Sequence, residues 1–155
     1  PAKDKSAPAG YQGITSAQIP SVDLPGGAGQ VRVIAGVYDG HHGPAKTFTP
    51  MNVWDVRLHA GHKLNLELPD GWSTALAIVA GTVLVNDAQV AREAQLVVME
   101  QSGTTLSLEA NGEVSLLLMS GEPIDEPIVG YGPFVMNSQQ EIVQAGNDFN
   151  SGKFK

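Results

Sequence analysis

The chain has 155 residues, which is enough for one domain with a sizeable core. Its formal net charge of −7 argues against nucleic acid or an anionic membrane as the main partner, because both require a basic surface. The absence of cysteine excludes a disulfide framework, a thiolate nucleophile and a cysteine-based metal site. No apolar run approaches the ~20 residues of a membrane span, and no signal peptide is recognisable. We therefore expect a cytoplasmic protein, which the lack of cysteine also fits.

The first 30 residues are rich in proline, glycine, alanine and serine, with isolated apolar residues between them. This composition predicts an extended lead-in arm with one short strand rather than a helix. The chain begins with Pro1 instead of methionine, so we expect either processing or a longer parent chain.

The next stretch carries β signals throughout. Residues 31–35 follow a glycine-rich turn and predict a strand, and residues 39–44 predict a loop. Residues 53–58 and 64–68 alternate between the two faces, the period-two pattern of half-buried strands. Residues 74–80 are apolar at almost every position, which predicts a strand covered on both faces.

Further short strands are predicted at residues 83–85, 96–99, 104–109 and 114–119. Glycine, proline and asparagine separate the predicted strands at intervals of roughly ten residues, which is typical of a sandwich or a jelly-roll barrel. Asn111-Gly112 is the strongest hairpin signal in the chain. The sequence therefore predicts an all-β fold.

Residues 119–138 can form neither a regular helix nor a central strand, because Pro123, Pro127 and Pro133 each remove a backbone donor. The stretch is nevertheless too apolar for a free linker. We expect an extended arm that packs on an apolar surface.

One short helix is predicted at the C-terminus. Ser138 and Glu141 fit the S-x-x-E capping box, and Ile142, Ala145 and Phe149 share one helix face. The expected organisation is a lead-in arm over residues 1–30, a β-barrel over residues 31–120, and a crossing arm with the helix over residues 121–155.

The four histidines are weak candidates for metal ligands. His41 and His42 are adjacent, so their side chains diverge in an extended loop, and the simplest interpretation is an exposed pair. His59 and His62 flank a break between two predicted strands and could converge on a structural metal. No third ligand is spaced to join them.

Glu67 and Glu109 each lie on the polar face of an alternating strand. If that face points into the barrel, the two carboxylates could do acid–base chemistry; otherwise they are ordinary solvated residues. Trp54 and Trp72 are most simply core and rim aromatics, with ligand stacking as the alternative. No G-x-S-x-G nucleophile context is present, and the glycine-rich turn at residues 26–29 precedes a strand, so it lacks the helix N-terminus of a phosphate loop.

The C-terminal arm carries a family resemblance. Three segments closely resemble the carboxy-terminal signature of the pirin family: Gly121-Glu122-Pro123-Ile124, Glu126-Pro127-Ile128-Val129 and Tyr131-Gly132-Pro133-Phe134-Val135-Met136-Asn137. Glu141-Ile142 with Ser151-Gly152-Lys153-Phe154 looks like the final helix and tail of that family, and Pro1-Ala2-Lys3-Asp4-Lys5 like its crossing from first to second domain. The resemblance covers nearly the whole chain.

Pirins are bicupins, with two β-barrels in a chain of almost twice this length. The resemblance implies that this chain is the second cupin barrel alone, a jelly roll, and that residues 1–30 are interdomain segment. It implies that iron, or another divalent metal, is held in the absent N-terminal half by three histidines and one glutamate. The cupin pattern places Glu67 and Pro69, and then Ser107 and Glu109, at the ligand positions here. Proline and serine are poor ligands, so we carry over no metal ligand, no cofactor and no catalytic residue.

Whole pirins are associated with a quercetin 2,3-dioxygenase-like activity in bacteria and with redox-linked transcriptional co-regulation in animals. The resemblance implies a non-catalytic half that supports or regulates the metal-bearing N-terminal cupin half. Two alternatives stay open. The chain could be a cupin enzyme of its own that uses a barrel pocket, or a module for protein interaction or transcriptional co-regulation. We expect any docking on the partner half to involve Tyr131, Phe134, Val135 and Met136.

Overall fold

The computed structural model describes residues 1–153 and consists of short strands, three 3₁₀ turns and one α-helix in that part of the chain. It divides into two compact units, which we call the barrel unit (Ala9–Pro123) and the end unit (Pro1–Pro8 with Ile124–Lys155). The 3₁₀ turns are Ala2–Asp4, Ser16–Gln18 and Pro25–Gly27. Residue 154, part of the tail resemblance, lies outside the described residues.

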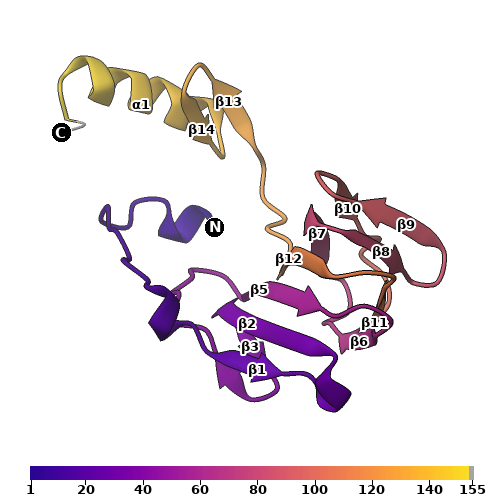
Figure 1. Cartoon of the computed structure of the whole chain (residues 1–155). Helices are drawn as coiled ribbons and strands as arrows, with labels where there is room; N and C mark the ends of the chain where they lie inside the picture. Colours follow the sequence, from indigo (N-terminus) through magenta and orange to yellow (C-terminus); the bar gives the residue numbers. More distant parts are fainter. Residues whose placement is uncertain (154–155) are drawn as a thin grey trace. The chain divides into compact units, whose positions relative to one another are not determined.

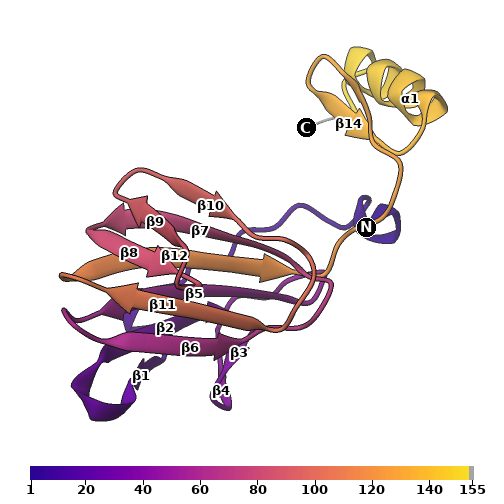
Figure 2. The same ribbon diagram turned by 90° about the vertical axis from the view of Figure 1, so that its right-hand side faces the viewer.

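The barrel unit is built from two antiparallel sheets that face each other (Figure 1, Figure 2). The large sheet has the order β1 (Ser21–Asp23), β2 (Gly29–Ala35), β5 (Met51–Leu58), β12 (Val114–Gly121), β7 (Ser73–Ala80) and β10 (Leu96–Val98). The small sheet has the order β6 (Lys63–Glu67), β11 (Thr105–Ala110), β8 (Thr82–Val85) and β9 (Gln89–Arg92). Neighbours in both sheets are mostly distant in sequence, as in a jelly roll. The predicted all-β, cupin-type jelly roll is confirmed.

Alternation along the strands builds the core between the two sheets. In β12 every second side chain from Val114 to Ser120 is buried, and in β6 Leu64 and Leu66 are buried between exposed neighbours. Each strand therefore gives one face to a shared apolar interior. The interior comprises Val31, Val33, Trp54, Val56, Leu58, Leu64, Leu66, Leu76, Ile78, Val83, Val85, Leu106, Leu108, Leu116 and Leu118, with smaller residues at its margins.

The tight hairpins occur where consecutive residues adopt positive φ. Asn86 and Asp87 have φ of 50° and 55° and join β8 to β9, as the mirror-image turns of hairpins require. Asp39 and Gly40, within a stretch predicted as a loop, do the same between β3 (Val37–Tyr38) and β4 (His41–His42). Backbone strand pairing therefore continues across a segment that the composition predicted as an irregular loop.

The prediction of a hairpin at Asn111-Gly112 is wrong. These residues join β11 in the small sheet to β12 in the large sheet, and neither has a positive φ. Both strands bury their apolar side chains against the shared interior, so burial sends them to opposite sheets and overrides the local turn signal. The chain crosses between sheets here instead of folding back on itself.

The lead-in residues divide between the two units. β1 adds to the edge of the large sheet through pairing with β2, and residues 9–30 group with the barrel unit. Residues 1–8 group with the end unit, where the Ala2 backbone N–H donates to Glu126 Oε2 over 2.7 Å. Lys5 Nζ donates to the Val135 carbonyl over 3.1 Å. The end unit is thus made from both ends of the chain.

The remainder of the end unit is a hairpin and a helix. The hairpin pairs β13 (Val129–Tyr131) with β14 (Phe134–Met136). The helix α1 (Gln139–Asn150) begins at the N-cap Ser138, whose side chain accepts a hydrogen bond from the Glu141 backbone N–H, as the capping box predicts. On its apolar face Ile142 and Ala145 are buried, whereas Phe149 is largely exposed and contacts the ring of Phe134 at the edge.

Candidate functional site

The barrel interior is aliphatic at the strands where the cupin pattern aligns its metal ligands. From β6 and β11 the buried, inward-facing side chains are Leu64, Leu66, Leu106 and Leu108. The aligned positions alternate with these leucines, and Glu67 and Glu109 are accordingly exposed on the opposite side of the sheet. This end of the interior is filled by leucine side chains, none of which can ligate a metal.

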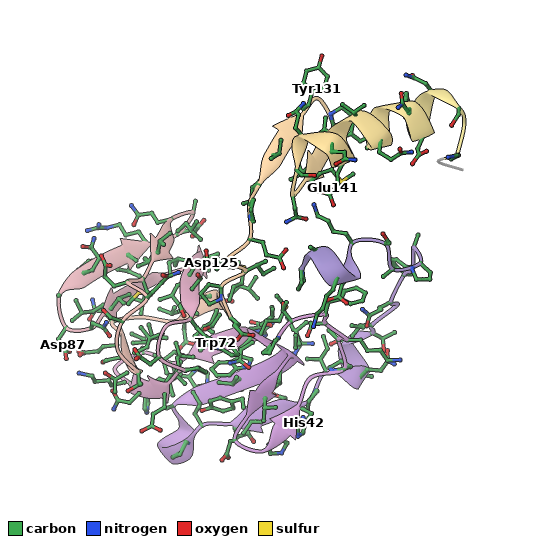
Figure 3. All side chains as sticks on the ribbon, turned by 180° about the vertical axis from the view of Figure 1, so that it is seen from behind. His42, Trp72, Asp87, Asp125, Tyr131 and Glu141 are labelled. Carbon is green, nitrogen blue, oxygen red and sulfur yellow. The ribbon has the colours of Figure 1, made fainter. Side chains whose placement is uncertain are left out.

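Glu67 and Glu109 do not form a carboxylate pair. In the β6–β11 ladder Glu67 lies opposite Thr105 and Glu109 lies opposite Lys63, so the two carboxylates stand at opposite ends of the same pair of strands. Lys63 Nζ also donates to Asp87 Oδ1 over 2.7 Å, and this hydrogen bond raises the pKa of Lys63. Figure 3 shows Asp87 at the periphery of the barrel unit. The polar face predicted for these strands is the solvated one.

His59 and His62 take separate partners. His59 Nδ1 lies 2.8 Å from Glu113 Oε2, whereas His62 Nδ1 lies 3.1 Å from the carbonyl oxygen of Ala60. Glu113 Oε1 also accepts the Ala60 backbone N–H. The hydrogen bond with His59 is the main reason why the pKa of Glu113 is lowered.

The other pair of histidines is exposed. His41 and His42 lie on the short β3–β4 hairpin, and Figure 3 shows His42 at the margin of the barrel unit. His41 Nδ1 contacts the carbonyl oxygen of Asp39 at 2.9 Å. Across residues 1–153, no three histidine, aspartate or glutamate side chains gather closely enough to hold a metal ion.

A small hollow of about 150 Å³ opens between the sheets at one end of the barrel. Leu106 of β11 and Thr74 of β7 line it, together with Leu68, Met99 and Trp72 from segments next to the strands. Thr74 is buried and shares a 2.8 Å hydrogen bond with the buried Ser120 hydroxyl. Besides hydroxyl and apolar surface, the hollow is lined by the Asn86 amide and the Glu100 carboxylate.

Trp54 lies deeper in the interior and confirms the predicted core aromatic. It is 3% exposed and packs edge-on against Tyr38 with ring centroids 5.1 Å apart. Burial, followed by the nearby Asp39 carboxylate, raises the pKa of Tyr38. The Trp54 indole N–H has no hydrogen-bond partner among the described residues.

The expected interaction residues of the end unit divide between two sides of the β13–β14 hairpin. Tyr131 lies opposite Phe134 on the side that lines a groove of about 370 Å³ against α1. Val135 is on the other side and is 59% exposed. Tyr131 is 73% exposed and projects from the tip of the hairpin in Figure 3. Phe134 and Met136 are half-buried, so Tyr131 and Val135 offer most of the free apolar surface.

The prediction that residues 74–80 are covered on both faces is wrong for this chain, because the outward face is left open on the barrel unit. Val79, Leu96 and Val98 lie on the outside of the large sheet and are 60%, 60% and 73% exposed. The signal that could have found this open apolar surface is the apolar run at residues 74–80, which leaves no polar face for solvent.

The chain resembles proteins of known sequence along nearly its whole length. It is 51% identical over 154 residues to a Pseudomonas aeruginosa protein named "Putative quercetin 2,3-dioxygenase", covering 99% of this chain and 54% of that protein. It is 34% identical over 147 residues to a pirin from Rattus norvegicus, covering 92% of this chain and 50% of that pirin. The chain therefore spans about half the length of the curated relatives that it matches.

Solved structures agree with these relatives. A crystal structure of quercetin 2,3-dioxygenase from Acinetobacter baumannii matches with a TM-score of 0.91 and 42% identity, covering 99% of this chain and 54% of that one.

None of the helices among the described residues has the length and apolar character needed to cross a membrane.

A model of a known protein family also matches the chain. The model of the pirin C-terminal cupin domain matches residues 53–155, which include the arm signature and most of the strands of the barrel. The chain belongs to the pirin family, in which it corresponds to the C-terminal cupin domain.

Proposed function

We propose that this chain is a metal-free cupin half that supports or regulates a metal-bearing N-terminal cupin half in a quercetin 2,3-dioxygenase-like protein. The observation that carries the proposal is the inner face of β6 and β11, where leucines occupy the space that a metal centre would need. The two carboxylates at the aligned ligand positions, Glu67 and Glu109, are exposed to solvent. In this proposal, iron or another divalent metal and the oxygen chemistry belong to the other half.

The size of the relatives supports a division of labour. The 51%-identical relative and the 42%-identical solved dioxygenase each contain nearly as much chain again as the part matched here. Cupin activity in such a chain requires only one half to carry a metal centre. The other half is then free to keep an interior optimised for packing, as this one is.

Metal analysis of the purified chain tests the metal-free assignment. After exposure to iron and removal of loosely bound ions, we expect transition metal well below one equivalent per chain. Glu67→Gln and His62→Ala variants provide matched controls, because neither change should alter the metal content. One tightly bound equivalent of iron, lost in either variant, would contradict the proposal.

Turnover of quercetin separates this proposal from an independent cupin enzyme. We expect no oxygen consumption with quercetin by the chain alone, with or without added iron. Turnover that disappears in Glu67→Gln, Glu109→Gln or His59→Ala would replace the supporting role with catalysis by this chain.

A second candidate function is protein interaction or transcriptional co-regulation through the end unit. The exposure of Tyr131 and Val135 on a hairpin with its own helix favours it. If this surface binds a partner, Tyr131→Ser and Val135→Asp should each weaken the complex by about tenfold or more, as for a central contact. Val90→Asp, at an exposed valine on the edge strand β9 of the barrel unit, is the control.

A further inference from the structure

The crossover between the two sheets contains an Asn-Gly pair that no turn geometry requires. Asn111-Gly112 joins β11 to β12, and neither residue has a positive φ. A Cβ added at Gly112 would meet no heavy atom within 4 Å, so no close backbone approach requires a glycine there either. The distinguishing property of the pair is therefore chemical, because a side-chain amide followed by glycine is unusually open to attack from the backbone.

Both groups that take part in such an attack are free of protein partners in the described part of the chain. Among residues 1–153 the Asn111 side chain makes no hydrogen bond, and the Gly112 backbone N–H donates to no acceptor. Both residues are exposed to solvent. The Gly112 nitrogen can therefore approach the side-chain carbonyl of Asn111 without breaking an existing interaction.

Other asparagines of the chain are held by their side chains. Asn86 Oδ1 accepts the Ser107 backbone N–H over 2.8 Å. Asn137 Nδ2 donates to Glu126 Oε2 over 3.2 Å and to the Pro127 carbonyl over 2.9 Å. Each of these amides has to leave its partner before its carbonyl carbon can react, and in each case the following residue has a side chain that shields the backbone nitrogen.

We propose that Asn111 is a site of spontaneous deamidation in the folded chain and that the rearranged product loosens the crossover. The Gly112 backbone nitrogen attacks the side-chain carbonyl carbon of Asn111 and loses its proton to solvent. A C–N bond forms, the side-chain amide leaves as ammonia, and a succinimide ring results. Water then opens the ring at either carbonyl carbon and yields aspartate or isoaspartate. Water is the only co-reactant, and no atom is oxidised or reduced.

Contacts with the turn between β5 and β6 fix the chain on both sides of the pair. The Ala110 N–H donates to the His62 carbonyl over 2.9 Å, and the Ala110 carbonyl accepts from the Gly61 N–H over 2.7 Å. On the other side, Glu113 Oε2 lies 2.8 Å from His59 Nδ1. In isoaspartate the backbone runs through the side-chain methylene, which lengthens the short connection between these two anchors. One of the anchors has to move.

The anchor at Glu113 is the weaker of the two. The side chains of Glu113 and His59 are 73% and 54% exposed, so solvent screens their interaction. Ala110 is 1% exposed and belongs to strand β11. We therefore expect isoaspartate to displace Glu113 from His59 and to leave Ala110 in place. The reaction also adds a negative charge to a chain whose net charge is already −7.

Incubation of the purified chain at mildly alkaline pH tests the reaction, because the attacking nitrogen must lose its proton. Peptide mapping by mass spectrometry measures the conversion of each asparagine in the folded chain and in the chain unfolded by guanidinium chloride. We expect Asn111 to convert in the folded chain at a rate within a few-fold of its rate in the unfolded chain. A folded-state rate lower by about tenfold or more would show that the site reacts only after local opening, and would overturn the proposal.

Two variants separate the effect of the fold from that of the sequence. Gly112→Ala should slow the conversion of Asn111 several-fold, because the methyl group hinders the attack, and the open space at this position accommodates it. Asp87→Gly places a glycine after Asn86, at a φ of 55° that glycine adopts readily. Because Ser107 holds the side chain there, we expect Asn86 in this variant to convert several-fold more slowly than Asn111 in the same chain. Equal rates at the two sites, or no effect of Gly112→Ala, would overturn the assignment.

NMR titration of the carboxyl groups tests the effect on the crossover. In the isoaspartate form the pKa of Glu113 should rise toward its ordinary value, because the hydrogen bond with His59 that lowers it is lost. Asn111→Asp is the matched control, because it adds the same charge without lengthening the backbone, and it should raise the pKa of Glu113 less. An unchanged pKa of Glu113 in the isoaspartate form would show that the crossover keeps its contacts, and would overturn the proposed loosening.

Discussion

The outer surfaces of the two sheets differ sharply, although both sheets cover the same interior. On the small sheet the outward residues of β6 and β11 are charged or polar, among them Lys63, Glu67 and Glu109. On the large sheet the corresponding positions of β12 and β7 include Leu117, Met119 and three apolar residues of β7. Val90 and Leu84 are the apolar exceptions on the small sheet.

This difference lies in the composition of the outward faces, which is polar on the small sheet and apolar on the large one. Alternation in a strand separates the side chains of one face from those of the other. The composition of the face turned away from the core indicates whether solvent or an apolar layer suits it. The small sheet has the usual half-solvated pattern of an antiparallel sheet. The large sheet is apolar on both faces, and the outward face includes the exposed Val79, Leu96 and Val98.

The largest expected effect lies on the inside of β12. Leu118 is 0% exposed, so Leu118→Ala should lower the free energy of unfolding by about 2–5 kcal/mol through lost burial and a cavity. Its neighbour Leu117 lies on the outward face of the large sheet, and Leu117→Ala should cost only about 1 kcal/mol in the chain alone. Urea unfolding of both variants measures the difference. Equal losses would mean that the outer face is already covered in this chain.

The buried hydroxyl pair should give the next effect. Ser120→Ala removes one partner of the 2.8 Å hydrogen bond and leaves the buried Thr74 hydroxyl unsatisfied, which should cost about 1–3 kcal/mol. The double change Ser120→Ala with Thr74→Val should recover part of this loss, because no unpaired hydroxyl remains. If the double variant does not recover stability, the two hydroxyls contribute to stability by more than satisfying each other's hydrogen bonds.

A charge introduced on the outer surface of either sheet should change stability little. The two changes should, however, differ in their effect on solubility. Val98→Asp and Val90→Asp should each leave the free energy of unfolding within about 0.5 kcal/mol of the unsubstituted chain. Only Val98→Asp should reduce self-association at high concentration, because only Val98 belongs to a contiguous apolar face. Analytical ultracentrifugation measures this. An equal effect of the two changes would remove the contrast between the sheets.

The smallest effect is expected at the crossover between the sheets, where Glu113 accepts its hydrogen bond from His59. The pKa of Glu113 is lowered, so its contribution to stability is present above the unfolded value and is lost as the pH falls through the folded one. His59→Gln should raise the pKa of Glu113 toward its ordinary value, which NMR titration of the carboxyl measures. The exposed position of both groups keeps the change in stability small.

The sequence predicted those features that depend on local pattern. Strand alternation at Leu64 and Leu66 separated the two faces of the strand, and the capping box at Ser138 and Glu141 identified the start of the helix. Both succeed because the determining contacts lie within a few residues. The family resemblance at residues 121–137 succeeded for a related reason, since closely spaced prolines and glycines restrict the backbone strongly.

The sequence alone did not predict features that depend on contacts between residues far apart in the chain. Asn111-Gly112 carries a hairpin signal, but the two strands beside it separate because each finds better burial in a different sheet. Whether Glu67 faced the interior or solvent was likewise undecided, because alternation gives two faces without saying which is inside. His59 meets Glu113 across 54 positions of the chain, a contact that no local spacing contains.

By itself, then, the sequence determined the all-β class, the phase of the alternation, the capped helix and the family, because these follow from composition, periodicity and motif. The tertiary structure alone decided which strands share a sheet, that Glu67 and Glu109 stand apart in solvent, and that both chain ends form one unit. It also decided which side chains of the apolar strand β7 face the interior and which face outward. The physical reason is that burial belongs to the assembled sheets, whereas a pattern belongs to one strand.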